Sequence, residues 1–389
     1  MKKKRTALSK TALACLVLSL TGTAGALPGL TAPQKATAAA TVSANQKVFY
    51  SLKHPVFKQS GQLYVPLRDA AELFDLHLTF NAQTKALELT GVSQYAKLQP
   101  GSAQAVGKNA VPVSLGAPVQ VRYGVTYVPA SLFSKLFGIP VNAAGPKKIS
   151  YTYSSKYRLT QSGGMLFWLN RQQGVLYGGT TGQLPARLGT VHIENPDELA
   201  LNARQVDDAT YIVDVDNAYG EPHIFSSLHR AVIHGGAIVA QSSLSYGGGL
   251  SQVRIKNADL SHDGKIVLNE GQTAQLVTLD GKVAETIDLE KIGGPDDEYG
   301  LEAVEPDFLL IRPFSTGALL IVDRATGKAT PLHRKLLDQA SSKKIDGSDW
   351  NSGDGLIYTG RDGNRLNFQW ALPGSGRPPE TKTYELGKS

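Results

Sequence analysis

The chain has 389 residues, of which 41% are hydrophobic, and it contains a single cysteine. Its formal net charge is +7, but residues 1–39 carry six Lys/Arg and no acid, which leaves 34 bases against 33 acids in the rest. One cysteine excludes a disulfide framework and a cysteine-based zinc site. A near-neutral chain without an arginine-rich stripe among aromatic residues also argues against nucleic-acid binding.

The first 39 residues are predicted to be a signal peptide. Residues 1–10 carry five bases, residues 11–20 are mainly apolar, and Ala36–Ala38 offers a small-residue cleavage site. This order is typical of secretion signals, and the apolar run is shorter than the roughly 20 residues that a membrane span needs. We therefore expect a secreted or surface-associated protein of a Gram-positive-type bacterium, without a transmembrane span once the signal is removed. Cys15 would be removed with the signal.

The next feature is a motif that occurs twice. Residues 61–76 read GQLYVPLRDAAELFDL, and residues 124–139, 63 positions later, read GVTYVPASLFSKLFGI. Each copy predicts a short strand that ends in Tyr-Val-Pro and leads directly into an amphipathic helix, since proline is well tolerated at a helix start. Tyr64, Pro66, Tyr127 and Pro129 are therefore structural motif positions and not candidate site residues.

Strands are predicted on both sides of each helix. Residues 48–52 and the segment around Val56–Phe57 precede the first motif, residues 106–121 lie between the copies, and residues 77–89 and 139–153 each predict a strand, a polar turn and a strand. With the Tyr-Val-Pro-Leu-Arg entry and the helix containing Glu72-Leu73-Phe74, residues 45–154 resemble the copper amine oxidase N-terminal-like, or stalk, domain. The resemblance implies an α+β fold with a small antiparallel sheet around a helix. This domain is common in exported proteins of Paenibacillus and related bacteria, and it has no copper or quinone cofactor.

Amine oxidation itself is not predicted. An amine oxidase needs a His-x-His copper pair and a modified tyrosine that follows an asparagine, and neither pattern occurs here. In the second copy Ala130-Ser131 replaces Leu67-Arg68, so no role of Arg68 can apply to both copies. The chain's eight histidines are His54, His77, His192, His223, His229, His234, His262 and His333.

Residues 156–389 repeat with a different period. Apolar strands are predicted to begin at residues 165, 211, 265, 308 and 356, which are 43 to 54 residues apart, and a second strand follows each one. Four of the five units then have a Gly-centred turn, at Gly182, Gly281, Gly327 and Gly374–Gly376. Repeats of this length with several short strands are typical of β-propeller blades. We expect an all-β domain, a five-bladed propeller, with a β-sandwich or an open array of sheets as alternatives.

No catalytic, cofactor-binding or metal-binding residue is predicted. His223, His229 and His234 lack the spacing of a metal site, and Asp214–Glu221 fails the requirements of a calcium loop, so it is interpreted as a polar turn. The carboxylates at 296–298, 302, 305 and 307, and those at 346, 349 and 354, are interpreted as solvated loops that could bind calcium. Trp168, Trp350 and Trp370 are expected in the core, with sugar stacking as the alternative.

The charge is divided unevenly between the two regions. Residues 40–154 contain 11 bases and 4 acids, whereas residues 155–389 contain 23 and 29. We therefore predict a non-enzymatic cell-envelope binding protein, in which residues 45–154 meet an anionic wall polymer and the propeller presents loops to a glycan or protein. Ordinary solubilising charge is the alternative for the first part. For the propeller, the alternative is a secreted glycan hydrolase or lyase. Carboxylates that converge at one mouth of the propeller would favour this alternative, whereas a central funnel lined by apolar or uncharged side chains would count against it.

Overall fold

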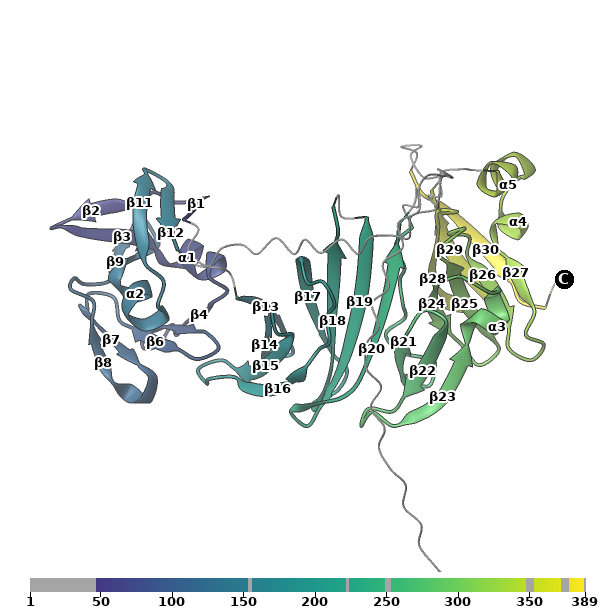
Figure 1. The fold of residues 1–389 in the computed structure, drawn as a ribbon, viewed down its shortest axis with the longest axis horizontal. Coiled ribbons are helices and arrows are strands. Elements are labelled where there is room, and N and C mark those ends of the chain that lie inside the picture. Colours follow the sequence, from purple (N-terminus) through teal and green to yellow (C-terminus); the bar gives the residue numbers. More distant parts are fainter. Residues whose placement is uncertain are drawn as a thin grey trace, which may run out of the picture. The chain divides into compact units, whose positions relative to one another are not determined.

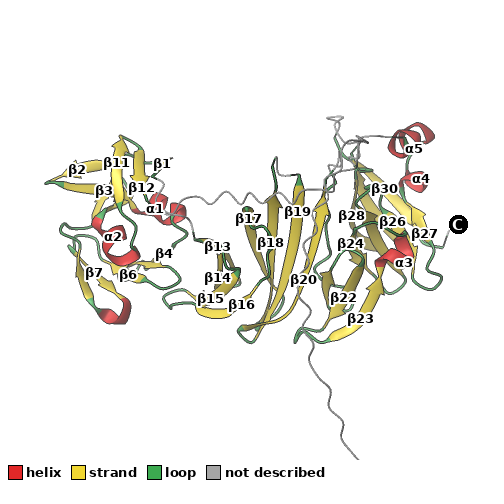
Figure 2. Cartoon of the chain, viewed as in Figure 1, coloured by secondary structure: helices red, strands yellow, loops and turns green. Residues whose placement is uncertain are grey.

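The computed structural model describes residues 47–152, 156–221, 224–248, 253–347, 353–371 and 378–387. The predicted signal peptide, its Cys15, and the junction at 154–155 lie outside these residues. Antiparallel sheets make up most of the described chain, and the helices are few and short (Figures 1 and 2). No helix in the described part is long and apolar enough to cross a membrane.

Three sheets and two helices form the N-terminal region. The first sheet contains β1 (Val48–Ser51), β12 (Lys148–Tyr151) and β11 (Val141–Gly145). The second contains β2 (Phe57–Gln59), β3 (Gln62–Pro66), β10 (Val125–Pro129) and β9 (Gln120–Arg122). The third contains β4 (His77–Phe80), β5 (Leu87–Thr90), β6 (Tyr95–Leu98), β7 (Gln104–Gly107) and β8 (Pro112–Ser114), with the 3-10 turn η1 (Lys108–Ala110) before β8. The helices are α1 (Leu67–Leu73) and α2 (Ser131–Phe137).

The two copies of the sequence motif pair with each other around a local two-fold axis. Strands β3 and β10 are antiparallel, and Val65 lies opposite Val128, its own counterpart in the second copy. Tyr64 lies opposite Pro129, and Pro66 lies opposite Tyr127. Each strand leads directly into a helix, as predicted, so the region contains two equivalent helices where the family resemblance implied one. Phe74, directly after α1, meets Phe133 of α2 edge to face, with ring centres 5.3 Å apart.

Five antiparallel sheets follow in chain order. The first sheet contains β13 (Tyr157–Ser162), β14 (Met165–Asn170), β15 (Val175–Thr180) and β16 (Ala186–Thr190). The second sheet contains β17 (Glu198–Gln205), β18 (Thr210–Tyr219), β19 (Phe225–His234) and β20 (Ala237–Gly247). The third contains β21 (Ile266–Asn269), β22 (Thr273–Val277) and β23 (Val283–Asp288). The fourth sheet contains β24 (Tyr299–Val304), β25 (Phe308–Pro313), β26 (Leu320–Asp323) and β27 (Ala329–Pro331). The fifth contains β28 (Leu356–Asp362), β29 (Arg365–Trp370) and β30 (Glu380–Glu385). The short helices are α3 (Leu289–Gly293), α4 (His333–Leu336) and α5 (Gln339–Asp346).

The five predicted strand pairs are all present, but three sheets begin with a strand that the sequence pattern did not reveal. These strands are β13, β17 and β24. Most side chains of β13 and β17 are partly or fully exposed, so these strands lack the apolar run by which the others were found. The second sheet is also longer than predicted, because β18, β19 and β20 have 10 or 11 residues each (Figure 1).

Apolar clusters join each C-terminal sheet to the next. Phe167 packs with Val213, Val232 with Leu268, Val267 with Leu309, and Leu310 with Phe368. Trp168 is fully buried, as expected for a core residue. No such cluster within the described residues joins β28–β30 to β13–β16.

A buried arginine joins the last two sheets. Arg312 of β25 donates to the backbone oxygens of Gly317, at 2.6 Å, and Leu356, at 2.7 Å. It also donates to Asp354 Oδ1 at 2.8 Å and to Glu302 Oε1 at 2.5 Å. Asp354 is fully buried and accepts the backbone N–H groups of Leu319 and Leu356. Burial alone would lower the pKa of Arg312, but the two carboxylates outweigh it and raise the pKa, so the guanidinium stays charged.

We expect Arg312→Gln to lower the free energy of unfolding by about 3–5 kcal/mol, because it leaves two carboxylates without their buried partner. Arg334→Gln is the matched control: Arg334 pairs with Asp346, but its side chain is 59% exposed, so the loss should be below about 1 kcal/mol. Urea unfolding of both variants measures the difference. Equal losses of unfolding free energy in the two variants would contradict the interpretation that Arg312 joins the last two sheets.

Candidate ligand-binding site

Three neighbouring cavities in the C-terminal region share the segment of residues 253–259 as a common wall. Their volumes are about 280, 560 and 830 Å³, within the range of small-molecule sites. Lys256 lines all three, and Arg254 lines the two larger ones. We call these three cavities the 253–259 cavities.

The segment is held in place by its own backbone. Ala258 donates its N–H to the Leu301 carbonyl at 2.7 Å, and Asn257 Oδ1 accepts the Leu301 N–H at 3.0 Å. The fit is so close that a Cβ on Gly300 would lie 2.7 Å from the Lys256 carbonyl oxygen. Val253 and Ile255 are buried, whereas Arg254 and Lys256 are exposed. Arg254 and Lys256 are therefore the solvent-accessible members of this segment, and both belong to the cavity linings.

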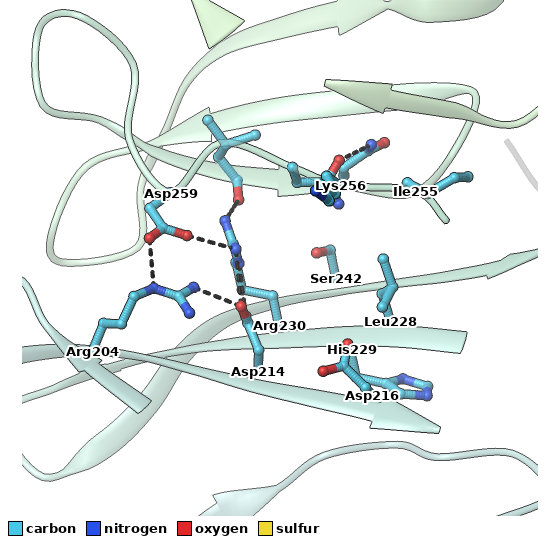
Figure 3. Close-up of a pocket in the computed structure, with 13 residues that line it drawn as sticks. Arg204, Asp214, Asp216, Leu228, His229, Arg230, Ser242, Ile255, Lys256 and Asp259 are labelled. Carbon is cyan, nitrogen blue, oxygen red and sulfur yellow. Dashed lines mark hydrogen bonds and ion pairs between the residues drawn. The ribbon is translucent and has the colours of Figure 1, made fainter. Parts of the chain in front are cut away.

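A network of two arginines and two aspartates forms one wall of the smallest cavity (Figure 3). Arg230 of β19 donates to both oxygens of Asp214, at 2.8 and 3.0 Å, and to Asp259 at 2.9 Å. It also donates to the backbone oxygens of Ala258, at 2.6 Å, and Val267, at 3.1 Å. Arg204 of β17 reaches the same carboxylates, with nitrogen–oxygen distances of 2.6 Å to Asp214 and Asp259.

The two arginines and two aspartates of this network form ion pairs with one another. Burial would raise the pKa of Asp214, but the bonds and charges of Arg230 and Arg204 outweigh it and lower the pKa. Likewise, burial would lower the pKa of Arg230, but Asp214 and Asp259 raise it. Both partners therefore stay ionised across the physiological range, and neither can exchange a proton with a substrate near neutral pH. The network holds the second and third sheets together.

Burial favours the neutral forms of two further cavity groups, Asp216 and His229, as it does for Arg171 and Tyr246 in the largest cavity. Burial, and then the charge of Asp214, raise the pKa of Asp216, which accepts a long hydrogen bond of 3.4 Å from the Asn202 side chain. Burial lowers the pKa of His229 to about 4. Its ring nitrogens lie 2.9 Å from the hydroxyls of Ser227 and Ser243, and no carboxylate contacts the ring among these bonds. The imidazole is neutral and structurally held, without the acid of a catalytic triad.

The largest cavity adds two arginines that bind backbone oxygens. Arg158 donates to the Leu199 carbonyl at 3.0 Å, and Arg171 donates to the Asp197 carbonyl at 2.9 Å. Arg171 Nε is buried without a hydrogen-bond partner in the structure. Ser226, Ser227 and Tyr246 contribute hydroxyl groups to the same lining. The cavity thus combines four bases and three acids with hydroxyl groups, and apolar side chains such as Leu199, Leu228 and Ile255 complete its lining.

The structure corrects the interpretation of Asp214–Glu221 as a polar turn. Asp214, Asp216 and Asn217 lie within β18, because the arginines of β17 and β19 neutralise Asp214 inside the sheet, and the turn begins only at Gly220. His229 and His234 lie on opposite faces of β19, since they are five positions apart in the strand. His223 lies outside the described residues.

The two carboxylate clusters are only in part solvated loops: Asp296–Glu298 lie on a loop, as predicted, but other members form ion pairs. Glu302 and Asp354 form the buried pairs with Arg312, and Asp307 pairs with Arg361 at 2.6 Å. Asp346 pairs with His333 and Arg334. In the described ranges, no group of three His, Cys, Asp or Glu side chains could hold a metal ion. Asp349 and Trp350 lie outside those ranges, and the Trp370 indole donates to the Asp354 carbonyl at 3.0 Å.

Comparisons with known proteins identify the N-terminal region. The sequence model of the family Copper amine oxidase N-terminal domain matches residues 43–151, which supports the resemblance found in the motifs. The search of curated protein sequences finds no significant match. Among solved structures, similarities include the nidogen/laminin complex (13% identity, 71% of this chain and 91% of that chain, TM-score 0.22). Another is the α-L-arabinofuranosidase arb93a of Fusarium graminearum (10% identity, 88% and 77%, TM-score 0.21). A third is a prolyl endopeptidase (10% identity, 88% and 47%, TM-score 0.27).

We predict that His229 makes the stability pH-dependent between its two pKa values. Its pKa is lowered from 6.5 to about 4 on folding, so its contribution is complete above pH 6.5 and is lost as the pH falls toward 4. The loss attributable to this residue should be roughly 2–3 kcal/mol at pH 4. In His229→Gln the difference in unfolding free energy between pH 7 and pH 4 should shrink by that amount.

The matched control for this prediction is His262→Gln, because the His262 side chain is 62% exposed. Denaturant unfolding at several pH values compares the two variants with the unchanged protein. Parallel pH profiles for His229→Gln and the unchanged protein would contradict the prediction.

Proposed function

We propose that the protein is exported and binds the cell envelope without catalysing a reaction. In this proposal residues 45–154 form the stalk domain, which holds the protein near anionic wall polymers. Residues 156–389 form a second domain of five propeller-like blades, which presents a ligand site to a glycan or protein. The closing of the blades into a ring is part of the proposal.

The exposed basic surface of the N-terminal region carries the first half of this proposal. Of its four acids, Glu72 pairs with Lys53, Glu88 lies 3.7 Å from Lys97, and the buried Asp69 binds His54. Most of its bases therefore face solvent without a carboxylate partner. Such a surface attracts polyanions, and the attraction is weakened by salt.

The edge strand β1 concentrates this positive charge beside aromatic rings. All four residues of β1 are exposed, including Phe49 and Tyr50. The amines of Lys47 and Lys148 lie 5.8 and 5.4 Å from the centre of the Phe49 ring. Exposed lysines also protect an edge strand against pairing with other chains, which is the alternative explanation for the same residues.

Retention on purified Gram-positive cell walls tests the proposal. Lys47, Lys147 and Lys148, replaced together by glutamine, should reduce retention at low salt by roughly tenfold, and high salt should abolish the difference. The control replaces Lys335, Lys343 and Lys344, which are exposed in and beside α4 and α5, and removes the same charge. Equal retention of both triple variants, or retention that ignores salt, would refute the anchoring half.

The enzymatic alternative, a secreted glycan hydrolase or lyase, has one observation in its favour. Three carboxylates, Asp214, Asp216 and Asp259, line the same cavity, and the pKa of Asp216 is raised as in a general acid. Asp214 and Asp259 are bound by arginines, so the second carboxylate that glycoside hydrolysis commonly uses would have to be Asp197 or Glu198, which line the largest cavity together with Asp216. Release of soluble sugar from wall polysaccharide that Asp216→Asn abolishes would establish this alternative.

A further inference from the structure

We propose that the 253–259 cavities bind an acidic oligosaccharide, with Arg254 and Lys256 as the residues that recognise its charge. This inference rests on the proposal that the C-terminal sheets bind an extracellular ligand, and it names the chemical class of that ligand. The charged side chains around these cavities are of two kinds: some form ion pairs with one another, and others face the cavities.

The paired charges are structural. Arg230 and Arg204 are neutralised by Asp214 and Asp259 on one side of the segment, and Arg312 is neutralised by Glu302 and Asp354 on the other. Arg254 and Lys256 form no ion pair with another described residue. Asp216 lies close enough to Arg254 for that charge to lower its pKa, although burial dominates and the net pKa is raised. The lining of the largest cavity thus has four basic residues, Arg158, Arg171, Arg254 and Lys256, against three acidic ones, Asp197, Glu198 and Asp216.

The two basic side chains are placed on a fixed backbone. The hydrogen bonds of Asn257 and Ala258 to Leu301, and that of Arg230 to the Ala258 carbonyl, tie the segment to the sheets on both sides. Ile255 anchors it further, because it is 4% exposed and packs with Leu244 and Tyr246. A positioned charge loses less conformational entropy on binding than one on a mobile loop.

The lining favours an extended, hydroxylated ligand. Since Lys256 belongs to all three cavities and Arg254 to two, a chain of several units could meet the same basic pair from adjoining cavities. Hydroxyl and amide groups of Asn217, Ser226, Ser227 and Tyr246 line the largest one. Such groups, with Asp216, suit the hydroxyls of a sugar, and the arginine suits its carboxylates. Arginine clusters also recognise acidic peptides, so an acidic peptide is the ligand that the experiment must distinguish from an acidic sugar.

The experiment is calorimetric titration of the purified protein with tetragalacturonate. The neutral tetrasaccharide maltotetraose and the peptide tetraglutamate serve as comparison ligands. The expected result is binding of tetragalacturonate at least tenfold tighter than either comparison ligand. Arg254→Gln/Lys256→Gln should weaken that binding at least tenfold, whereas Lys343→Gln/Lys344→Gln in α5 removes the same charge and should leave it unchanged. Thermal unfolding confirms that both double variants are folded.

Several outcomes would overturn the inference. These are failure of the unchanged protein to bind tetragalacturonate, equal binding of maltotetraose, equal binding of tetraglutamate, or equal losses in the two double variants. Wall retention of Arg254→Gln/Lys256→Gln is measured in parallel. Retention that still depends on Lys47, Lys147 and Lys148 would show that the anchoring proposal stands even where the oligosaccharide inference has failed.

Discussion

The arrangement of the C-terminal sheets depends on buried arginines that bind backbone oxygens of the following sheet. Arg230 reaches Ala258 and Val267, and Arg312 reaches Leu356, in each case with carboxylates on the remaining donors. A guanidinium has five donors and cannot be deprotonated in a protein, so it is tolerated in the interior only where oxygen acceptors surround it. Each arginine thus requires the next sheet to supply its carbonyls at one position.

The need for carbonyl acceptors on the next sheet explains why buried arginines lie between sheets that apolar packing alone would hold together. A buried ion pair contributes little net stability over an apolar pair of the same volume, but it tolerates only one geometry. The clusters around Val232 and Leu310 supply the apolar contact, while Arg230 and Arg312 determine which residues of the next sheet lie opposite. The same bonds fix the segment of residues 253–259, and with it Arg254 and Lys256.

The sequence predicted the parts of the fold in which periodicity and turn residues agree. The Tyr-Val-Pro copies, the two helices and the five strand pairs follow from local pattern, and even the pairing of Val65 with Val128 is a natural result of duplication. Strands β13 and β17 could not be predicted, because most of their side chains are at least partly exposed and their sequences therefore lack a run of apolar residues. Asp214 and Asp354 were misinterpreted as loop residues for a related reason: their partners, Arg230 and Arg312, lie 16 and 42 positions away, on strands whose contacts no local pattern specifies.

The division between paired and available charge also bears on what the C-terminal region does. Catalysis by carboxylates needs two groups whose pKa values are set apart near the working pH, one acid and one base. Here the arginines that join the sheets also bind the neighbouring carboxylates, Asp214 with Arg230 and Glu302 with Arg312, and the pKa of Asp214 is lowered, so it stays ionised. Asp216 lies in the largest cavity with the exposed Glu198 and the exposed bases Arg254 and Lys256. The interactions that join the sheets thereby remove Asp214 and Glu302 from the groups available to a ligand, and Arg254 and Lys256 are the exposed bases that our proposal assigns to an acidic one.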